Sequence, residues 1–379
     1  MITFGLVLTL AFSALLAYVL WRAASVPSLA RRLSRRGFAA LGAVLALVFL
    51  LACTLGHGEA GWAAQAVDWA AMNLLGAVLL LFAALLAADV ATAFGLLFPR
   101  WAPALRGWAL LAGALLSAVA LVQGHRAPEV VSHEVTLPDL PPALDGTVVV
   151  AVSDAHLGAR LGADWFAGRV RQIEALRPDL LLFLGDIFEG HGDAPPELPG
   201  LRALPAPLGK WFVTGNHEAF GGGGGNELLE RSGFRRLANE WAEVAPGLVL
   251  AGVDDLTTHR RRRLPGDPLG ETLAGLPRAA TILMSHTPSQ AERAARAGVQ
   301  LMLSGHTHGG QIWPFGYLTA RAFPLLAGRY DVAGMAVVVS RGAGTWGPRM
   351  RLWKRGEILK LTLRAPGPGA FRDAATARR

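Results

Sequence analysis

The chain has 379 residues, of which 52% are hydrophobic and 17% are charged. It is too long and too apolar to be one ordinary soluble domain. Its single cysteine, Cys53, excludes an intrachain disulfide, and its formal net charge of +8 comes without a basic stripe interleaved with aromatic residues. We therefore expect no nucleic-acid partner, and the sequence leaves the oligomeric state open.

The first third of the chain, residues 1–123, is rich in alanine, leucine and valine. Four of its segments approach the ~20 apolar residues that cross a bilayer: Ile2–Trp21, Phe38–Leu55, Trp69–Ala88 and Trp108–Val122. We expect a transmembrane region of about four helices, the second and fourth of them short. Three or five helices, a buried helical bundle and a cleaved signal are the alternatives, and the last is disfavoured because no basic region precedes Ile2.

Positive charge predicts the orientation of these helices. Arginines crowd the first and third connections, whereas the second connection has neither lysine nor arginine. Cytoplasmic loops carry an excess of such residues, so the first and third connections should lie inside. The protein is then an integral protein of the bacterial inner (plasma) membrane, and the remainder of the chain is extracytoplasmic. If one of the weaker segments does not cross the membrane, the remainder of the chain would instead be cytoplasmic. The arginines are Arg22, Arg31, Arg32, Arg35, Arg36, Arg100 and Arg106.

The rest of the chain divides into a tether, a folded domain and a tail. Residues 124–143 contain several prolines and form a tether or, over Glu134–Leu137, an edge strand. Residues 144–364 form the folded domain. The proline-, glycine- and arginine-rich residues 365–379 are expected to be disordered.

Within the domain we expect helices over Asp164–Leu176 and Asn226–Ala242, and terminal strands over Ala336–Ser340 and Ile358–Leu363. Gly221–Gly225 is five glycines in a row. We expect these glycines to form a flexible loop, either a plain connection or a gating lid.

Five strand-like apolar runs end in aspartate, histidine or asparagine. In open α/β sheets, ligands bind beyond the carboxyl ends of the strands, and imidazoles and carboxylates are common metal ligands. The ordered pattern therefore predicts a metal site at one rim. The residues are Asp154 and His156, then Asp186, then Asn216 and His217, then His286, and finally His306 and His308.

These blocks resemble the signature of the calcineurin-like metallophosphoesterase family, which runs D-x-H, G-D, G-N-H-[DE], a later H, and G-H-x-H. The resemblance covers roughly residues 144–363, and Gly309–Gln311 and Ser340–Gly342 look like the bacterial membrane-associated branch. It implies a two-sheet α/β sandwich with helices outside and a dimetal site at one rim.

The resemblance also implies a role for each residue. A metal-bridged hydroxide would attack phosphorus between two divalent ions, and His217 would be the catalytic outer acid. Alternatively, His217 would be a third metal ligand, or it would support another ligand through a hydrogen bond. One metal would be held by Asp154, His156 and His308, the other by Asn216, His286 and His306, and Asp186 would bridge them.

One position departs from the family pattern. The Gly185–Asp186 block is followed by Glu189 where the family often has aspartate, and we expect Glu189 to brace a ligand from the second shell. His191 either contacts substrate or lies on an exposed loop. Arg260–Arg263 either attract phosphates or form a solvated loop. No arginine beside the Gly215–Glu218 block matches the phosphate clamp of the protein Ser/Thr phosphatases, which disfavours a phosphoprotein substrate.

The expected cofactors are two divalent ions, with Mn²⁺ first and Fe or Zn²⁺ as alternatives because the ligands mix nitrogen and oxygen. The expected partners are membrane lipids and a phosphoester substrate. The predicted enzyme is a membrane-anchored phosphoesterase that hydrolyses phosphoester or phosphodiester bonds, the latter as a phosphodiesterase. Its expected substrate is lipid-linked or part of the cell envelope, such as a UDP-diacylglucosamine-like pyrophosphate or a phospholipid. A catalytically silent sensor or scaffold is the alternative, although every ligand position holds a ligand-competent residue.

Overall fold

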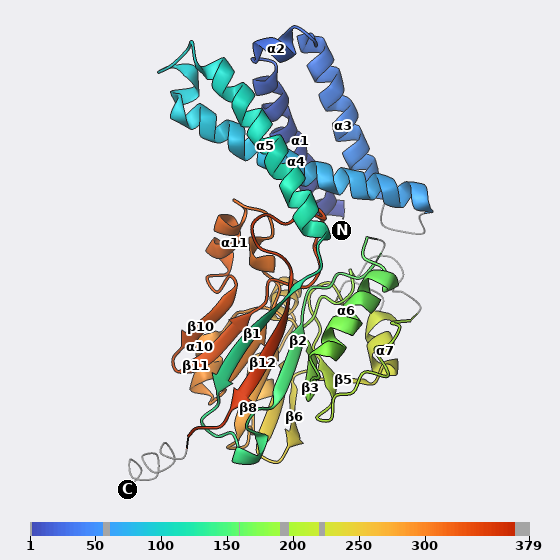
Figure 1. The fold of residues 1–379 in the computed structure, drawn as a ribbon, viewed down its shortest axis with the longest axis vertical. Coiled ribbons are helices and arrows are strands. Elements are labelled where there is room, and N and C mark those ends of the chain that lie inside the picture. The colour runs from blue at the N-terminus through green and yellow to red at the C-terminus, as the bar shows by residue number, and fades with distance from the viewer. Residues whose placement is uncertain (1, 56–60, 159, 190–196, 220–223, 368–379) are drawn as a thin grey trace. The chain divides into compact units, whose positions relative to one another are not determined.

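The computed structural model describes residues 2–55, 61–158, 160–189, 197–219 and 224–367. By their internal contacts, the residues fall into two compact units. Unit 1 comprises Met1–Arg126 with Gln311–Phe315 and Trp346–Arg355. Unit 2 comprises Ala127–Gly310, Gly316–Thr345 and Gly356–Arg379. Figure 1 shows the helices of unit 1 and the two sheets of unit 2.

Unit 1 is built on long apolar helices. Among the described residues, four helices are long and apolar enough to cross a membrane, which confirms the predicted four. Those expected to be short span 21 and 24 residues, so that expectation was wrong. The four are α1 (Ile2–Ala23), α3 (Arg35–Leu55), α4 (Trp62–Ala91) and α5 (Ala102–His125), with the short α2 (Pro27–Ala30) and η1 (Ala93–Gly95) in the connections.

A buried ion cluster ties three of these helices together. Asp89 of α4 is fully buried, and its carboxylate lies 2.6 Å from Arg22 Nε of α1 and 2.8 Å from Arg106 Nε of α5. The Tyr18 hydroxyl also donates to Asp89. A buried charge is tolerated only when it is paired, so this cluster fixes the three helices at one end of the unit. Arg22 and Arg106, counted above as loop charges, are thus partly neutralised.

Two distant segments of the chain also belong to unit 1. Ile312, Met350 and Leu352 are buried with Leu80 of α4 and Ala120 of α5. The backbone N–H of Arg351 donates to the Ala120 carbonyl (2.9 Å), and that of Trp353 donates to Gln123 Oε1 (2.9 Å). Both segments lie inside the range 144–364 that was assigned to the folded domain from sequence.

The first sheet of unit 2 contains six strands in the order β1-β12-β2-β3-β4-β5. β2, β3, β4 and β5 are parallel, so their carboxyl ends lie at the same edge, while β12 runs antiparallel to β2 and parallel to β1. The bounds are β1 (Glu129–Thr136), β2 (Val148–Val152), β3 (Leu180–Phe183), β4 (Lys210–Phe212), β5 (Phe234–Arg236) and β12 (Glu357–Arg364).

The second sheet has the order β10-β11-β9-β8-β7-β6. β7, β8, β9 and β11 are parallel, and antiparallel strands close both edges. The bounds are β6 (Glu240–Ala245), β7 (Leu248–Val253), β8 (Ala280–Ser285), β9 (Leu301–Ser304), β10 (Gly328–Val332) and β11 (Met335–Val339).

The two sheets pack face to face around a buried aliphatic core. Leu182 and Val149 of the first sheet share this core with Ile282 and Leu303 of the second. Such runs of valine, leucine and isoleucine suit strands that are covered on both faces. A second core lies where α6 covers the first sheet, through Phe166 and its neighbours. This confirms the predicted two-sheet α/β sandwich following an α-helical membrane region.

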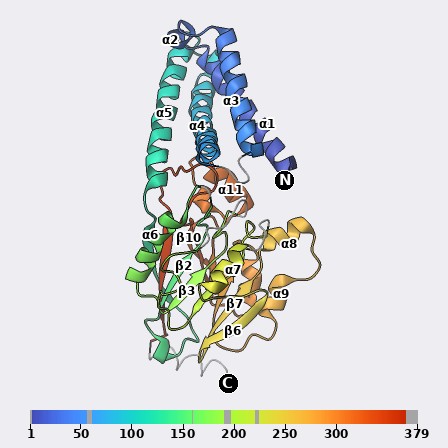
Figure 2. The same ribbon diagram turned by 90° about the vertical axis from the view of Figure 1, so that its right-hand side faces the viewer.

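Shorter elements complete unit 2, and Figure 2 shows α8 and α9 beside the second sheet. The predicted helix at Asp164–Leu176 is confirmed as α6, and the terminal strands are confirmed as β11 and β12. The elements are η2 (Pro142–Leu144), α6 (Ala163–Ala175), α7 (Gly224–Arg231), α8 (Leu256–Arg262), α9 (Pro268–Leu273), α10 (Ala291–Arg296), η3 (His308–Gly310) and α11 (Gly316–Ala322).

Two local predictions were wrong in part. The helix expected over Asn226–Ala242 ends at Arg231 as α7, because the following residues pair as β5 and β6 with neighbouring strands and that pairing overrides the helical pattern. Gly224 and Gly225 begin α7 instead of belonging to a loop. Residues 220–223 and 368–379 lie outside the described residues, as do most of the glycine-loop and tail predictions.

Candidate metal centre

The predicted site residues follow the strands of both sheets and come together in unit 2. Each follows the carboxyl end of a parallel strand: β2, β3 and β4 of the first sheet, and β8 and β9 of the second. Their donor atoms form three overlapping groups, and the atoms within each group lie within 4.8 Å of one another. The groups are Asp154, His156 and His308; His156, Asp186 and His217; and Asp186, His286 and His306.

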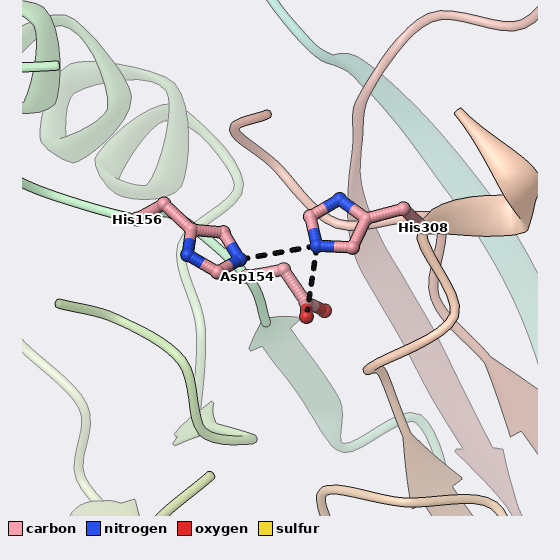
Figure 3. A group of neighbouring side chains, drawn as sticks. All are labelled: Asp154, His156 and His308. Carbon is pink, nitrogen blue, oxygen red and sulfur yellow. Dashed lines mark hydrogen bonds and ion pairs between the residues drawn. The ribbon is translucent and has the colours of Figure 1, made fainter. Parts of the chain in front are cut away.

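The first group is drawn in Figure 3. His156 Nε2 lies 3.0 Å from His308 Nε2, and His308 Nε2 lies 3.5 Å from Asp154 Oδ1. All three side chains are buried. Two imidazole nitrogens and a carboxylate oxygen that converge in this way form a donor set suited to a divalent transition metal.

The third group contains His286 and His306 together with Asp186. His286 Nε2 lies 3.2 Å from Asp186 Oδ2 and 3.2 Å from His306 Nδ1. The same Asp186 oxygen lies 3.9 Å from His156 Nε2, which belongs to the first group. The Asp186 carboxylate therefore reaches both groups.

Asn216 tests whether this donor set fits a metal. Its Oδ1 is buried and has no hydrogen-bond partner within the described part of the chain. An unsatisfied buried acceptor of this kind costs about 1–3 kcal/mol. A divalent cation would satisfy this oxygen, and amide oxygen is a known type of ligand for divalent cations. The residues present thus fit a metal centre.

The backbone at five of the seven predicted ligand positions adopts the left-handed conformation. Such a conformation is uncommon outside glycine and costs about 1–3 kcal/mol per residue when sparsely populated. It places successive side chains toward the site from very short loops. The φ angles are 51° at Asp154, 49° at His156, 52° at Asp186, 72° at His306 and 51° at His308.

Glu218 organises this backbone, and the sequence analysis gave it no role. Its carboxylate accepts hydrogen bonds from the backbone N–H groups of Asp186 (2.9 Å), Ile187 (2.6 Å), Phe188 (3.1 Å) and Gly215 (2.8 Å). It thereby joins the loop after β3 to the loop after β4. A Cβ atom on Gly215 would lie 2.2 Å from Asp186 Oδ1, so only glycine allows this approach.

Glu189 contacts a ligand from outside. Its Oε2 lies 3.1 Å from His156 Nδ1, and its Oε1 accepts from Arg160 Nη2 at 3.0 Å. Burial alone would raise the pKa of Glu189, but the hydrogen bond and charge of His156, with Arg160, lower it to about 2. The Glu189 backbone carbonyl lies 2.8 Å from His217 Nδ1. His191 lies outside the described residues.

The charges at the centre favour an ionised Asp186. Burial would raise the pKa of this carboxyl, but the charge and hydrogen bond of His286 outweigh that effect and hold the pKa well below its usual range. Burial has the opposite effect on His286, yet the Asp186 carboxylate raises the pKa of this imidazole well above its usual value. The pair is thus an anion with a strongly basic partner.

The segment Ser340–Gly344 after β11, called the glycine strap below, supports the backbone turn at Asp154. From the sequence, only the resemblance of Ser340–Gly342 to the bacterial membrane-associated branch was noted. The backbone N–H groups of Ala343 and Gly344 donate to the carbonyls of Ser153 and Asp154, each at 2.9 Å. Arg341 holds the strap in place through an ion pair of 2.6 Å with the buried Glu357.

Comparison with known proteins agrees with this geometry. Residues 147–310 match the calcineurin-like phosphoesterase family. A metallophosphoesterase of Aquifex aeolicus is 36% identical over 225 residues, which cover 58% of this chain and 85% of that protein. The YkuE metallophosphoesterase of Bacillus subtilis is 32% identical over 279 residues, which cover 69% of this chain and 94% of that protein. Both are described as uncharacterized.

A bovine relative is described as a transmembrane protein with a metallophosphoesterase domain. It is 35% identical over 280 residues, which cover 68% of this chain. The match spans 62% of the bovine protein, a little under two thirds of its length.

The site geometry and the sequence relatives point to the same family. The chain belongs to the calcineurin-like metallophosphoesterase family. The apolar helices of unit 1 and the segments Gln311–Phe315 and Trp346–Arg355 lie outside the range that matches the family model.

Proposed function

We propose that this protein is a membrane-anchored dimetal phosphoesterase. The observation that carries the proposal is the position of the Asp186 carboxylate, which reaches His286 of one ligand group and His156 of the other. A shared carboxylate of this kind suits two adjacent cations. In this proposal Asp154, His156 and His308 hold one ion, Asn216, His286 and His306 hold the other, and Asp186 bridges them.

Two bound divalent ions would supply Lewis-acid charge that polarises the phosphoryl group and makes a water nucleophilic near neutral pH. The protein would supply proton transfer through His217. The His217 Nδ1–H donates to the Glu189 carbonyl, which fixes the ring orientation and the tautomer. Nε2 is then the atom that exchanges a proton with the leaving oxygen, as in general acid catalysis.

We propose Mn²⁺ as the activating metal, with Fe or Zn²⁺ as alternatives. The centre offers imidazole nitrogens, carboxylate oxygens and one amide oxygen. Mg²⁺ prefers all-oxygen surroundings and dehydrates reluctantly, so it suits this mixed set less well. Glu189 would act from outside by orienting the imidazole of His156.

The test uses the full chain in a neutral detergent, stripped of metal and reloaded. Bis(p-nitrophenyl) phosphate reports diester hydrolysis, and p-nitrophenyl phosphate reports monoester hydrolysis. We expect turnover that requires added Mn²⁺ and prefers the diester. Turnover that survives metal removal, or a chain that binds no metal, would contradict the proposal.

A lipid-linked substrate is the natural extension of this activity. The segments of unit 1 that pack on α4 and α5 expose Trp313, Trp346 and Trp353. Tryptophan is enriched at membrane–water interfaces. One of these segments, Gln311–Phe315, directly follows the loop of His308 in the chain. This connection supports the proposal that the enzyme takes its phosphoester from a lipid.

We further propose that the catalytic unit is extracytoplasmic, at the bacterial inner membrane. Although Arg22 and Arg106 pair with Asp89, the exposed arginines in the first and third connections still favour a cytoplasmic location for those loops. An extracytoplasmic site favours a phospholipid over a UDP-diacylglucosamine-like pyrophosphate, because nucleotide-linked sugars are made inside the cell. The arginines are Arg31, Arg32, Arg35, Arg36 and Arg100.

A further inference from the structure

Four consecutive arginines, Arg260–Arg263, stand on α8 and its carboxyl-terminal cap. Asp255 is the N-cap of this helix, and its Oδ2 accepts a hydrogen bond from the Thr258 backbone N–H at 2.6 Å. It ends at Arg263, which adopts a left-handed φ of 52°. The position of this helix decides whether the arginines belong to the site or to an unrelated surface.

The first turn of α8 is tied to the ligand loop after β8. Thr287, the residue after His286, donates its hydroxyl to Asp255 Oδ1 at 2.5 Å. The Thr287 hydroxyl oxygen also lies 3.1 Å from the hydroxyl oxygen of Thr257. All three side chains of this contact are buried, so the helix start has a fixed position beside the loop of His286.

The last turn is tied to the ligand loop after β4. Arg262 Nη2 donates to the carbonyl oxygen of Ala219 at 2.5 Å. Ala219 directly follows Glu218, and His217 precedes Glu218. The helix therefore connects two loops that carry site residues, and Figure 2 shows it at one end of the sandwich. The sequence showed no arginine beside the Gly215–Glu218 block, but the fold brings one there.

The neighbouring arginines Arg260, Arg261 and Arg263 are exposed. Within the described part of the chain, no ion pair joins Arg260, Arg261 or Arg263 to a carboxylate. Exposed positive charge at the rim of a site attracts anions and raises their local concentration.

We propose that Arg260 and Arg261 bind a second anionic group of the substrate, a phosphate or a carboxylate that lies beyond the phosphate being hydrolysed. This inference rests on the proposed function, because it assumes that the first phosphate binds at the metal centre. Guanidinium groups recognise such oxyanions through paired, charge-assisted hydrogen bonds. The substrate class is then a phosphoester with at least two anionic groups, in contrast to one with a neutral or zwitterionic head group.

The test is calorimetric titration of the full chain, Mn²⁺-loaded and in a neutral detergent. Butylphosphonate and butane-1,4-diphosphonate serve as probes, because their C–P bonds resist phosphoester hydrolysis and they differ by one anionic group. The variant is Arg260→Gln with Arg261→Gln. Arg296→Gln is the matched control, because Arg296 is an exposed arginine that precedes β9 and so lies away from the carboxyl ends of the strands.

We expect the unaltered chain to bind the diphosphonate about 10-fold more tightly than the monophosphonate, as one added charge-assisted contact predicts. The double variant should reduce this advantage to the statistical factor of about 2 and leave the monophosphonate affinity unchanged. The control should keep the full advantage.

The inference is wrong if the unaltered chain binds the diphosphonate no more tightly than the monophosphonate. It is also wrong if the double variant retains the full diphosphonate preference, or if it loses affinity for both probes equally. Monophosphonate binding without a diphosphonate preference rejects this inference alone. Failure of both probes to bind, together with no Mn²⁺-dependent hydrolysis, rejects the proposed function as well.

Discussion

His217 lies at the edge of the metal centre, where a proton-transfer group and a metal ligand would occupy similar positions. Its backbone N–H donates to Asp186 Oδ1 (2.8 Å), and its Nδ1 is engaged by the Glu189 carbonyl (2.8 Å). The first contact fixes the backbone of His217, and the second orients its ring through Nδ1. The sequence analysis left the same alternatives open.

The variant His217→Ala separates these roles. We expect turnover to fall by about 10²–10⁴-fold, as for a lost general acid, while two metal ions per chain remain bound. Turnover and metal content are measured on the same preparation, the latter by inductively coupled plasma mass spectrometry. Loss of one ion per chain would show that His217 is a ligand.

Glu218 is the residue whose structural role the sequence did not reveal. One carboxylate satisfies four backbone N–H groups from two ligand loops. The spacing of the signature shows that an acid follows His217, but three of its four partners come from a loop about 30 residues earlier and are visible only in the fold.

Replacing Glu218 with glutamine retains the shape but places an amide NH₂ against backbone donors. Hydrogen bonds to charged groups contribute about 1.5–3 kcal/mol each, so we expect Glu218→Gln to lower the free energy of unfolding by about 3 kcal/mol. Glu230→Gln, on the exposed face of α7, is the control. Equal thermal midpoints for the two variants would argue against the bracing role.

At the scale of elements, the sequence predicted best where a pattern repeats over many residues. The long apolar helices were predicted from the length of their apolar runs and α6 from its helical periodicity, and β11 and β12 were also predicted as strands. The helix prediction for the residues after α7 was wrong because β5 pairs with β4 and β6 pairs with β7, and this pairing overrides the helical pattern. The predicted site residues come together because each follows a strand. Glu218 and Gly344 act through backbone contacts that leave no sequence pattern.

The glycine strap after β11 offers a test at this scale. A Cβ atom on Gly344 would lie 2.1 Å from the Ala155 carbonyl oxygen, and the Gly344 N–H supports the Asp154 carbonyl. We expect Gly344→Ala to displace the Asp154 turn and weaken Mn²⁺ binding by about 10–100-fold, the range typical of lost outer support. Gly162→Ala is the control, because nothing lies within 4 Å of its added Cβ. Unchanged Mn²⁺ affinity in Gly344→Ala would contradict the role of the strap.

At the scale of the molecule, the helices of unit 1 and the two-sheet sandwich of unit 2 were predicted from different features of the sequence. The apolar composition predicted the helices, and the ordered histidine and aspartate motifs predicted the sandwich. The sequence did not predict that segments Gln311–Phe315 and Trp346–Arg355 would pack with the helices, because only a few buried residues make those contacts. The side of the membrane follows from helix count and charge alone.

A reporter fused to the carboxyl terminus tests that orientation. Four spanning helices with a cytoplasmic first connection place the terminus outside. We therefore expect an alkaline phosphatase fusion to be active and a green fluorescent protein fusion to be dark when exported through the general secretory route. The opposite pair of signals would place the catalytic unit in the cytoplasm and favour a nucleotide-linked lipid substrate.

The central claim is that Asp186 joins two metal ions in a hydrolytic site, and Asp186→Asn tests it most directly. The asparagine retains the shape but removes the negative charge that lies between His156 and His286. The measurement is Mn²⁺-dependent hydrolysis of bis(p-nitrophenyl) phosphate together with bound metal per chain. We predict two ions and turnover in the unaltered chain, with reduced metal occupancy and no turnover in the variant. A variant that hydrolyses the diester at the original rate would contradict this account.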